Sequence, residues 1–204
     1  MNAILLGSQL RGSERLRRES RPQSGCADRE SSQGLAESQA RERHDRTECR
    51  STKIRNSRDR KSALYNQDLE GENAPAAWVS FRQKIKSADA VLFVTPEYNR
   101  SVPGALKNAL DVASLPFGKN MWDGIPGAVI SVSPGAIGAF GANHALRQSL
   151  VFLNVPAMQP PEAYIGGATD LFDAAGKLTN PITRDFLKKF VQSFAKWIEA
   201  NRRG

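Results

Sequence analysis

The stretch that decides the fold is A-V-L-F-V-T-P-E-Y-N-R-S-V-P-G-A-L-K-N-A-L-D, which runs from Ala90 to Asp111. Its first five residues are apolar without a break, as in a strand that is buried on both faces. A polar loop follows, and Pro103 then stands where a helix can begin, because proline suits the first helical turn. The stretch therefore predicts a strand, a loop and a helix of an α/β fold.

The same order of elements is predicted on both sides of this stretch. Apolar runs at 2–8 and 126–133 predict two more buried strands, and 155–160 predicts a last one. Helices are predicted after Pro75, over 142–153 and after Pro181, where Asn180 or Thr179 can cap the first turn. The alternation favours an open parallel sheet covered by helices on both faces.

Residues 9–62 do not fit this pattern. They contain no aromatic residue and carry fifteen Lys and Arg against nine Asp and Glu, whereas residues 63–204 carry fourteen against twelve. Most of the formal net charge of +8 therefore lies in this segment. So polar a composition cannot bury enough apolar surface to offset the entropy of chain ordering. We predict one domain over residues 1–204, with 9–62 an anomalous segment that is mostly disordered or poorly packed.

The cysteines and the hydropathy indicate a cellular compartment. Cys26 and Cys49 form neither a C-x-x-C pair nor a disulfide framework, so they are typical of free thiols in a reducing cytosol. No window approaches the roughly 18 apolar residues of a membrane span. We expect a soluble, cytoplasmic protein that has no metal site.

Three loops follow predicted strands, where parallel sheets bind ligands. The loop after Leu6 offers backbone N–H groups, Ser hydroxyls and arginines to a phosphate, or it is a plain turn. Residues 96–99 provide a ledge for a flat aromatic ligand, or Glu97 and Asn99 only cap the next helix. The loop from Ser133 to Gly141 has few bulky side chains, so it either makes room for a ligand or is a flexible connection.

Three motifs carry a resemblance to a known family: T-P-E-Y-N-R-S-V-P-G-A-L-K-N-A-L-D, S-V-S-P-G-A-I-G and H-A-L-R-Q-S-L-V-F-L-N. In this order they resemble the NAD(P)H-dependent FMN reductases, especially the bacterial chromate and quinone reductases, from about Leu64 to Ala200. The resemblance implies a flavodoxin-like three-layer sandwich that binds FMN noncovalently. It also implies ping-pong hydride transfer from NADH or NADPH to quinones, chromate, azo or related acceptors, in a homodimer or homotetramer.

The resemblance also assigns roles to residues. Arg100 would hold an anionic acceptor or the nicotinamide phosphates, or would simply be a solvent-exposed charge. Arg147 resembles a subunit contact, with a helix-surface ion pair as the alternative. No catalytic side chain is expected, because the flavin N5 carries the hydride, and we interpret His144 as a helix-surface residue. The residues implied to line the isoalloxazine ring are Pro96, Glu97, Tyr98 and Asn99, with Ser133 and Gly135 at its other edge.

The chain departs from the family in the loop that should hold the FMN phosphate. Only fragments of the pattern G-S-x-R-x-x-S-x-N remain, and Ser8, Arg17 and Ser20 are the candidate phosphate ligands. We therefore expect an atypical first strand-helix-strand unit and weak FMN retention. Our hypothesis for residues 9–62 is a divergent insertion or an out-of-frame stretch, and resequencing the gene distinguishes the two.

The basic segment also raises alternatives from another class. The chain could be a non-catalytic flavin-binding protein, or a nucleic-acid-binding protein that uses residues 9–62. The nine interspersed acids and the missing aromatic residues argue against a dedicated nucleic-acid arm. A third alternative is a relic that folds without cofactor and has no activity.

Overall fold

The computed structural model describes residues 3–8, 53–57 and 63–202. They all belong to one compact unit, which comprises residues 1–8 and 53–204. The prediction of disorder for the anomalous segment falls outside the described residues, except at Lys53–Ser57, which form strand β2.

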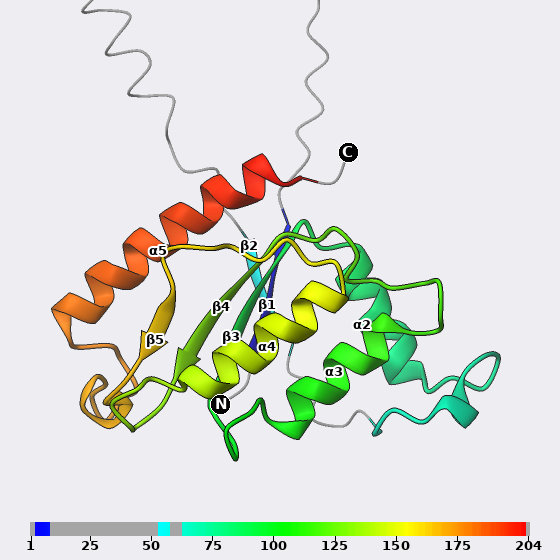
Figure 1. Ribbon diagram of the computed structural model, residues 1–204, viewed down its shortest axis with the longest axis horizontal. Coiled ribbons are helices and arrows are strands. Elements are labelled where there is room, and N and C mark those ends of the chain that lie inside the picture. The colour runs from blue at the N-terminus through cyan, green and yellow to red at the C-terminus, as the bar shows by residue number, and fades with distance from the viewer. Residues whose placement is uncertain (1–2, 9–52, 58–62, 203–204) are drawn as a thin grey trace, which may run out of the picture. The chain divides into compact units, whose positions relative to one another are not determined.

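The sheet has five strands in the order β2-β1-β3-β4-β5 (Figure 1). The three strands β3, β4 and β5 run parallel to one another, and helices connect them in the predicted α/β order. The strand bounds are β1 Ala3–Ser8, β2 Lys53–Ser57, β3 Ala90–Thr95, β4 Gly127–Val132 and β5 Ala163–Ile165.

β1 corrects the expectation of a wholly parallel sheet. It pairs antiparallel with both β2 and β3, with Gly7 opposite Ala90 and Ala3 opposite Val94. Parallel neighbours need a crossover of a dozen or more residues, usually a helix with an apolar face. The sequence between β1 and β2 has no such apolar pattern, so the first unit is atypical, as the sequence indicated.

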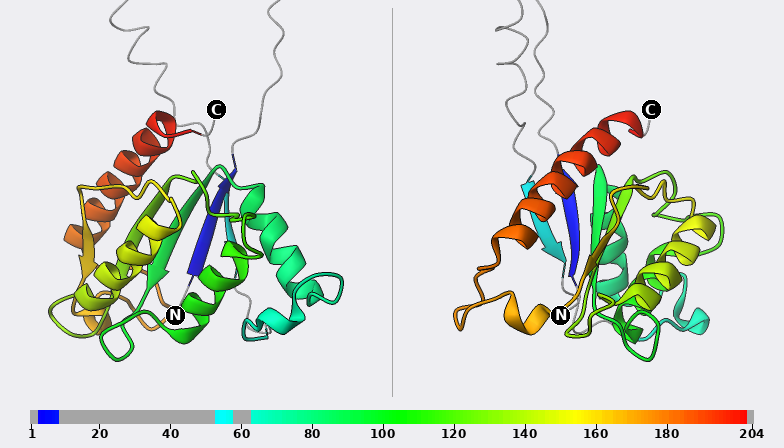
Figure 2. Two further views of the ribbon diagram at one scale, coloured as in Figure 1. Left: turned by 45° about the vertical axis from the view of Figure 1, so that its right-hand side comes forward. Right: turned by 60° about the vertical axis from the view of Figure 1, so that its left-hand side comes forward.

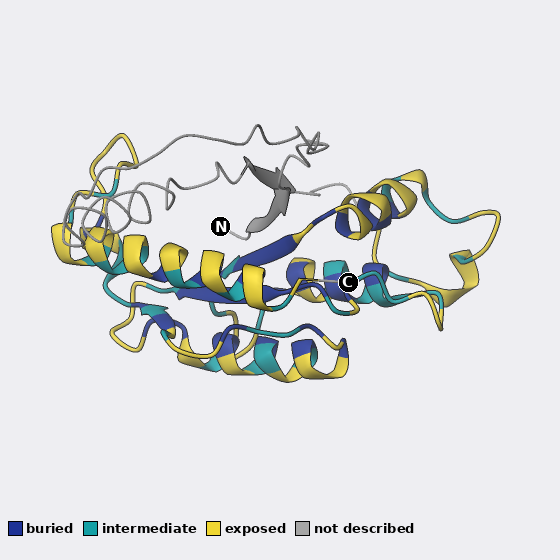
Figure 3. Cartoon of the chain, turned by 90° about the horizontal axis from the view of Figure 1, so that it is seen from above, coloured by how far each residue is buried: buried dark blue, intermediate teal, exposed yellow. Residues whose placement is uncertain are grey.

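Helices cover the sheet on both faces, and alternate residues of β3 and β4 point to opposite sides. Val91, Phe93 and Val129 pack with the helices α2 (Ala76–Lys86), α3 (Gly104–Ser114) and α4 (Phe140–Phe152). The residues between them, such as Leu92 and Ile130, pack with α5 (Pro181–Ala200) on the other face. Figure 2 shows α5 and α4 on opposite sides of the sheet, and Figure 3 shows the buried strands between exposed helix surfaces. Short 3-10 helices η1 (Gln67–Leu69) and η2 (Ala168–Asp170) lie in connections.

The terminal helix begins as predicted. The Asn180 side chain accepts the backbone N–H of Thr183 at 2.9 Å, and Pro181 occupies the first helical position. This cap satisfies a donor that the helix leaves without an internal partner. The remaining predicted helices are also present within two residues of their expected starts.

The predicted last strand at 155–160 is wrong, because the strand lies at Ala163–Ile165 instead. Residues before it do run beside β4: Gly127 donates its N–H to Pro156 and accepts that of Met158, at 3.1 and 2.8 Å. Prolines at 156, 160 and 161 lack the N–H group that a continued ladder needs. The ladder therefore forms only after the last of these prolines.

Across the described ranges, no helix is both long and apolar enough to cross a membrane.

Candidate functional site

The polar loop after β3 ends in a tight two-residue turn. Tyr98 and Ser101 exchange backbone hydrogen bonds, with N···O distances of 2.9 and 3.0 Å. Asn99 and Arg100 between them have φ angles of 50° and 65°. Positive φ at both central residues is the signature of a type I′ turn, which favours Asn but not Arg. The turn projects Tyr98, Asn99 and Arg100 into solvent, with the Arg100 side chain 80% exposed.

The start of this loop is anchored by buried polar contacts. The fully buried Thr95 hydroxyl donates to the carbonyl of Pro96 at 2.8 Å. The Glu97 carboxylate is only 14% exposed and accepts the N–H of Ala142, in the first turn of α4, at 3.1 Å. Its other oxygen lies 3.6 Å from the Arg100 guanidinium. Glu97 therefore caps α4 and not α3, the helix that follows it, which corrects that alternative.

This remote cap has a clear physical reason. The residue at the N-cap position of α4, Ala139, has no side chain that can accept a hydrogen bond, and its φ is 59°. Glu97 supplies the missing acceptor from another loop and places a negative charge at the positive end of the helix dipole.

The loop after β4 is held against β5. The Ser133 N–H donates to the Ile165 carbonyl at 2.9 Å, and the Ser133 carbonyl accepts the N–H of Ala168 at 3.1 Å. The Ser133 hydroxyl accepts the N–H of Gly135 at 3.1 Å, which closes a small turn. These contacts fix the loop's base, while residues 134–137 remain exposed.

The glycines of this edge serve two different purposes. A Cβ on Gly138 would lie 2.5 Å from the Tyr164 carbonyl carbon, and one on Gly166 would lie 2.4 Å from the Ala136 oxygen, so packing requires both. A Cβ on Gly135 would meet only the Ser133 oxygen at 3.5 Å, and one on Gly104 would meet nothing within 4 Å. Neither of these two has a left-handed φ, so nothing within the described part of the chain requires glycine there. Each of these two glycines therefore leaves room for another group to approach its backbone.

The two loops meet at the carboxyl edge of the parallel strands. Thr95 of β3 pairs with Ser131 of β4, so both loops leave the sheet at the same level, at the lower edge in Figure 1. A Cβ on Gly141 would lie 2.9 Å from the Arg100 carbonyl, which measures how closely the turn approaches α4. The structure thus brings together seven of the predicted site residues, which are Pro96, Glu97, Tyr98, Asn99, Arg100, Ser133 and Gly135.

The predicted phosphate ligands are not part of this group. Ser8 lies opposite Lys53 and one residue beyond the pair of Gly7 with Ala90, so it sits at the amino end of β3. The length of β3 separates it from Pro96, because β1 is antiparallel. This corrects the expectation that the loop after β1 shares an edge with the other two. Arg17 and Ser20 lie outside the described residues.

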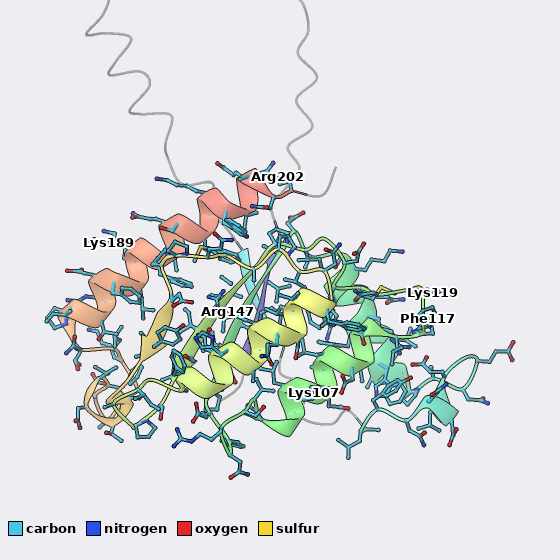
Figure 4. All side chains as sticks on the ribbon, in the orientation of Figure 1. Lys107, Phe117, Lys119, Arg147, Lys189 and Arg202 are labelled. Atoms are coloured by element: carbon cyan, nitrogen blue, oxygen red, sulfur yellow. The ribbon has the colours of Figure 1, made fainter. Side chains whose placement is uncertain are left out.

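The neighbouring surface of α4 and β5 holds the remaining residues of interest. His144 is exposed, as predicted, and its Nε2 lies 3.0 Å from the Tyr164 hydroxyl. Burial, together with the hydrogen bond and the charge of Glu162, raises the pKa of Tyr164 to about 12, and the charge of Arg147 opposes this shift. Arg147 lies on the side of α4 nearest β5 (Figure 4). Its 3.9 Å contact with Glu162 is the ion pair that the sequence left as an alternative, and its side chain is 19% exposed.

Comparison with known proteins identifies the family to which this fold and these three motifs belong. The sequence model of the NADPH-dependent FMN reductases matches residues 29–170. The chain belongs to this family. The FMN reductase family was the one indicated by the motifs, and its flavodoxin-like α/β fold is confirmed by a solved structure. That structure is FerB from Paracoccus denitrificans, a flavoenzyme NAD(P)H:(acceptor) oxidoreductase. The two chains are 43% identical with a TM-score of 0.66, covering 70% of this chain and 78% of FerB.

Two curated relatives are similar over the same share of the chain. A quinone reductase of Pseudomonas putida is 66% identical over 139 residues, which cover 68% of this chain and 74% of that protein. A 2-hydroxy-1,4-benzoquinone reductase of Burkholderia sp is 44% identical over 139 residues, covering 68% and 75% of the two chains.

Sequence reasoning missed several residues that build the site. The cap that Glu97 provides for Ala142 joins residues 45 positions apart, and no local pattern indicates such a pair. The close approach of Gly138 to β5 also depends on tertiary packing. One signal was present in the sequence: Asn143 and Arg147 are four residues apart, which is the spacing of side chains that touch on a helix.

Proposed function

We propose that the protein is an FMN-dependent NAD(P)H oxidoreductase that reduces quinones, with chromate, azo and related compounds as further acceptors. The observation that carries the proposal is the pair of loops, 96–101 and 133–139, at one edge of the parallel strands, in a chain of the FMN reductase family. When FMN is bound, its ring takes a hydride from NAD(P)H and supplies electrons to the acceptor. A cytoplasmic location is part of the proposal.

The chain's own residues hold and orient the ligands. Pro96 and Tyr98 would offer flat apolar surface to the ring, and Asn99 would offer an amide, from the loop that leaves the sheet at the same edge as the loop of Gly135. The buried carboxylate of Glu97 keeps the loop of residues 96–101 fixed to α4. The flavin and nicotinamide rings can stack only if the two loops keep a fixed spacing. The contact of Glu97 with α4 fixes this spacing and so contributes to the orientation of the rings.

Arg100 is the cation of this edge that can meet an anionic ligand. Its guanidinium is 80% exposed and only loosely paired with Glu97, so it can turn toward a phosphate or chromate at little cost. The turn that carries it holds a non-glycine residue at φ 65°. Such strain is often found where a side chain has a binding role. We assign Arg100 to NAD(P)H phosphates or an anionic acceptor.

The FMN phosphate has no organised cradle among the residues that the structure describes at this edge. Arg17 and Ser20 remain our predicted ligands, and we expect weak FMN retention because the phosphate carries most of the charge of FMN. Dialysis followed by a flavin absorbance spectrum measures this. Stoichiometric flavin that survives dialysis would contradict the expected weak retention.

We also propose that the protein is a homodimer or homotetramer that associates through the outer face of α4. That face exposes Phe140 at the start of the helix and Val151 and Phe152 at its end, with the last two residues 79% and 89% exposed. Large apolar side chains that are exposed next to one another, as Val151 and Phe152 are, mark protein contacts. Sedimentation should give an oligomer for the wild type and a smaller species for the Phe152→Glu variant. A monomeric wild type would contradict association.

The proposed activity is tested by one assay. The protein is mixed with FMN, NADH or NADPH and a benzoquinone, and the oxidation of NAD(P)H is followed by absorbance. We expect turnover that requires both protein and FMN, with parallel lines in double-reciprocal plots, since donor and acceptor use the same space in turn. No turnover at saturating FMN would remove the enzyme assignment.

A further inference from the structure

A chain of hydrogen bonds runs from the surface of α4 to the ligand loop after β4. The Arg147 Nε donates to the Asn143 Oδ1 at 2.9 Å, and the Asn143 Nδ2 donates to the Ser131 Oγ at 3.1 Å. The Ser131 hydroxyl lies 2.7 Å from the Gly138 carbonyl. Asn143 and Ser131 are both completely buried. Buried polar side chains that are linked in this way are costly to break singly.

The direction of every bond in the chain follows from chemistry. Arg147 can only donate, so the Asn143 atom that faces it must be the carbonyl oxygen, and the amide nitrogen must face Ser131. That nitrogen uses its second proton toward the Ala163 carbonyl at 3.4 Å. Because the amide donates to the Ser131 oxygen, the single hydroxyl proton is free for Gly138, its shortest contact.

The far end of Arg147 is fixed as well. Its Nη1 donates to the Met158 carbonyl at 3.0 Å, and Glu162 lies 3.9 Å from its Nε. The hydrogen-bonded chain is therefore held at its outer end, Arg147, by the segment before β5. It is held at its inner end by Ser131, which is a residue of β4.

The hydrogen-bonded chain of side chains ends at the Gly138 carbonyl, which belongs to the peptide where the loop turns into α4. Gly138 has a φ of 60° and Ala139 a φ of 59°, so two left-handed residues in succession turn the chain from the loop into α4. A trans peptide points its N–H opposite to its C=O, so fixing the Gly138 carbonyl inward fixes the Ala139 N–H in the outward direction. The backbone of β5 blocks movement on the other side, since it lies 2.5 Å from the position of a Gly138 Cβ.

We propose that Asn143 and Arg147 are positioning residues for FMN. They act through Ser131 and Gly138 to hold loop 133–139 in the conformation that receives the edge of the flavin ring. This inference rests on the proposed function, and it assigns a role to buried side chains that lie behind the loop, inside the protein.

Two variants break the chain at different atoms. Ser131→Ala removes the hydroxyl that holds Gly138. Asn143→Asp keeps the size and the acceptor for Arg147, but a carboxylate cannot donate to Ser131 and instead attracts its proton away from Gly138. Ser149→Ala is the matched control, because the Ser149 hydroxyl bonds only the helix carbonyl of Ala145, at 3.3 Å.

The experiment has two readouts on the full-length protein. The first is amide hydrogen exchange of residues 133–140 without FMN, with α5 as the internal reference. We expect at least about fivefold faster exchange in both variants but not in the control, since one lost hydrogen bond changes an opening equilibrium by about that factor. The second is the FMN dissociation constant, expected to rise about five- to tenfold in both variants and less than about twofold in the control.

Each outcome is decisive. Unchanged exchange in the loop overturns the claim that the chain holds it. Faster exchange with an unchanged dissociation constant overturns the positioning role. A wild type that does not bind FMN refutes the proposed function together with the positioning role, while the exchange data still report whether the chain holds the loop.

Discussion

The carboxylate of Glu97 accepts the backbone N–H of Ala142 at 3.1 Å, although 45 residues separate them in the chain. The loop after one strand thereby caps the helix that follows the next strand. Ala139 offers no side-chain cap, and Glu97 satisfies one of the N–H groups that this end of α4 leaves without an internal partner. The two loops of the proposed flavin site are therefore joined by a side chain as well as by the sheet.

Removing this cap should loosen both loops together. We expect Glu97→Ala to lower the free energy of unfolding by about 1–2 kcal/mol, the usual effect of deleting a helix cap. Glu97→Gln should lose less, because its amide oxygen still accepts the N–H of Ala142. Urea unfolding measures both, with Glu72→Ala as the control at an exposed position. Equal stabilities of wild type and Glu97→Ala would show that the cap contributes nothing.

Arg100 should contribute to NADPH binding without stabilising the fold. Its φ of 65° favours glycine, so we expect Arg100→Gly to leave the free energy of unfolding unchanged or to raise it by up to about 1 kcal/mol. The KM for NADPH should rise about fivefold, as expected for loss of one exposed charged contact worth about 1 kcal/mol. The KM for an uncharged quinone should change less. The assignment fails if the two KM values rise equally.

The segment before α2 should depend on a nearly buried ion pair. Arg82 donates its Nε to the Val112 carbonyl at 2.8 Å and forms a two-pronged ion pair with Glu70, including a contact of 3.1 Å. Arg82→Met leaves the Glu70 charge unpaired, so we expect a loss of about 3 kcal/mol in the free energy of unfolding. Lys84→Met, exposed on the same helix, is the matched control. A loss below about 1 kcal/mol for Arg82→Met would contradict this.

Tyr164 should make stability fall at alkaline pH. Burial, with a smaller contribution from Glu162, raises its pKa in the folded protein from 10.0 to about 12, so the folded state keeps a proton that the unfolded state has lost between these values. Its contribution to stability is complete below pH 10 and disappears as the pH rises to about 12. The free energy of unfolding, measured with denaturant between pH 10 and pH 12, should fall less steeply with pH in the Tyr164→Phe variant than in the wild type. An identical slope in the variant would show that another group is responsible.

The sequence predicted those elements that depend on residues close together in the chain. The apolar run at Ala90, the proline before α3 and the cap at Asn180 correctly predicted β3, the start of α3 and the start of α5. The seven predicted site residues lie at one edge because the carboxyl ends of neighbouring parallel strands lie together.

Other features could not be predicted because they depend on partners far away in the chain. β1 runs antiparallel to β3, and its apolar sequence does not indicate whether it pairs parallel or antiparallel with its neighbour. The place of β5 was missed because an apolar run outweighed the prolines within it. Arg147 donates hydrogen bonds to Asn143 and to the Met158 carbonyl inside the protein. Only Asn143 is near Arg147 in the sequence, so this role could not be predicted.

The central claim is that a flavin ring lies against Gly135, and one binding measurement tests it directly. A Cβ at this position meets no protein atom closer than 3.5 Å, so Gly135→Ala should unfold like the wild type. The same methyl group should obstruct the ring, and we expect an FMN dissociation constant at least about tenfold above that of the wild type. Equal dissociation constants in the two proteins would place the flavin elsewhere and contradict the site.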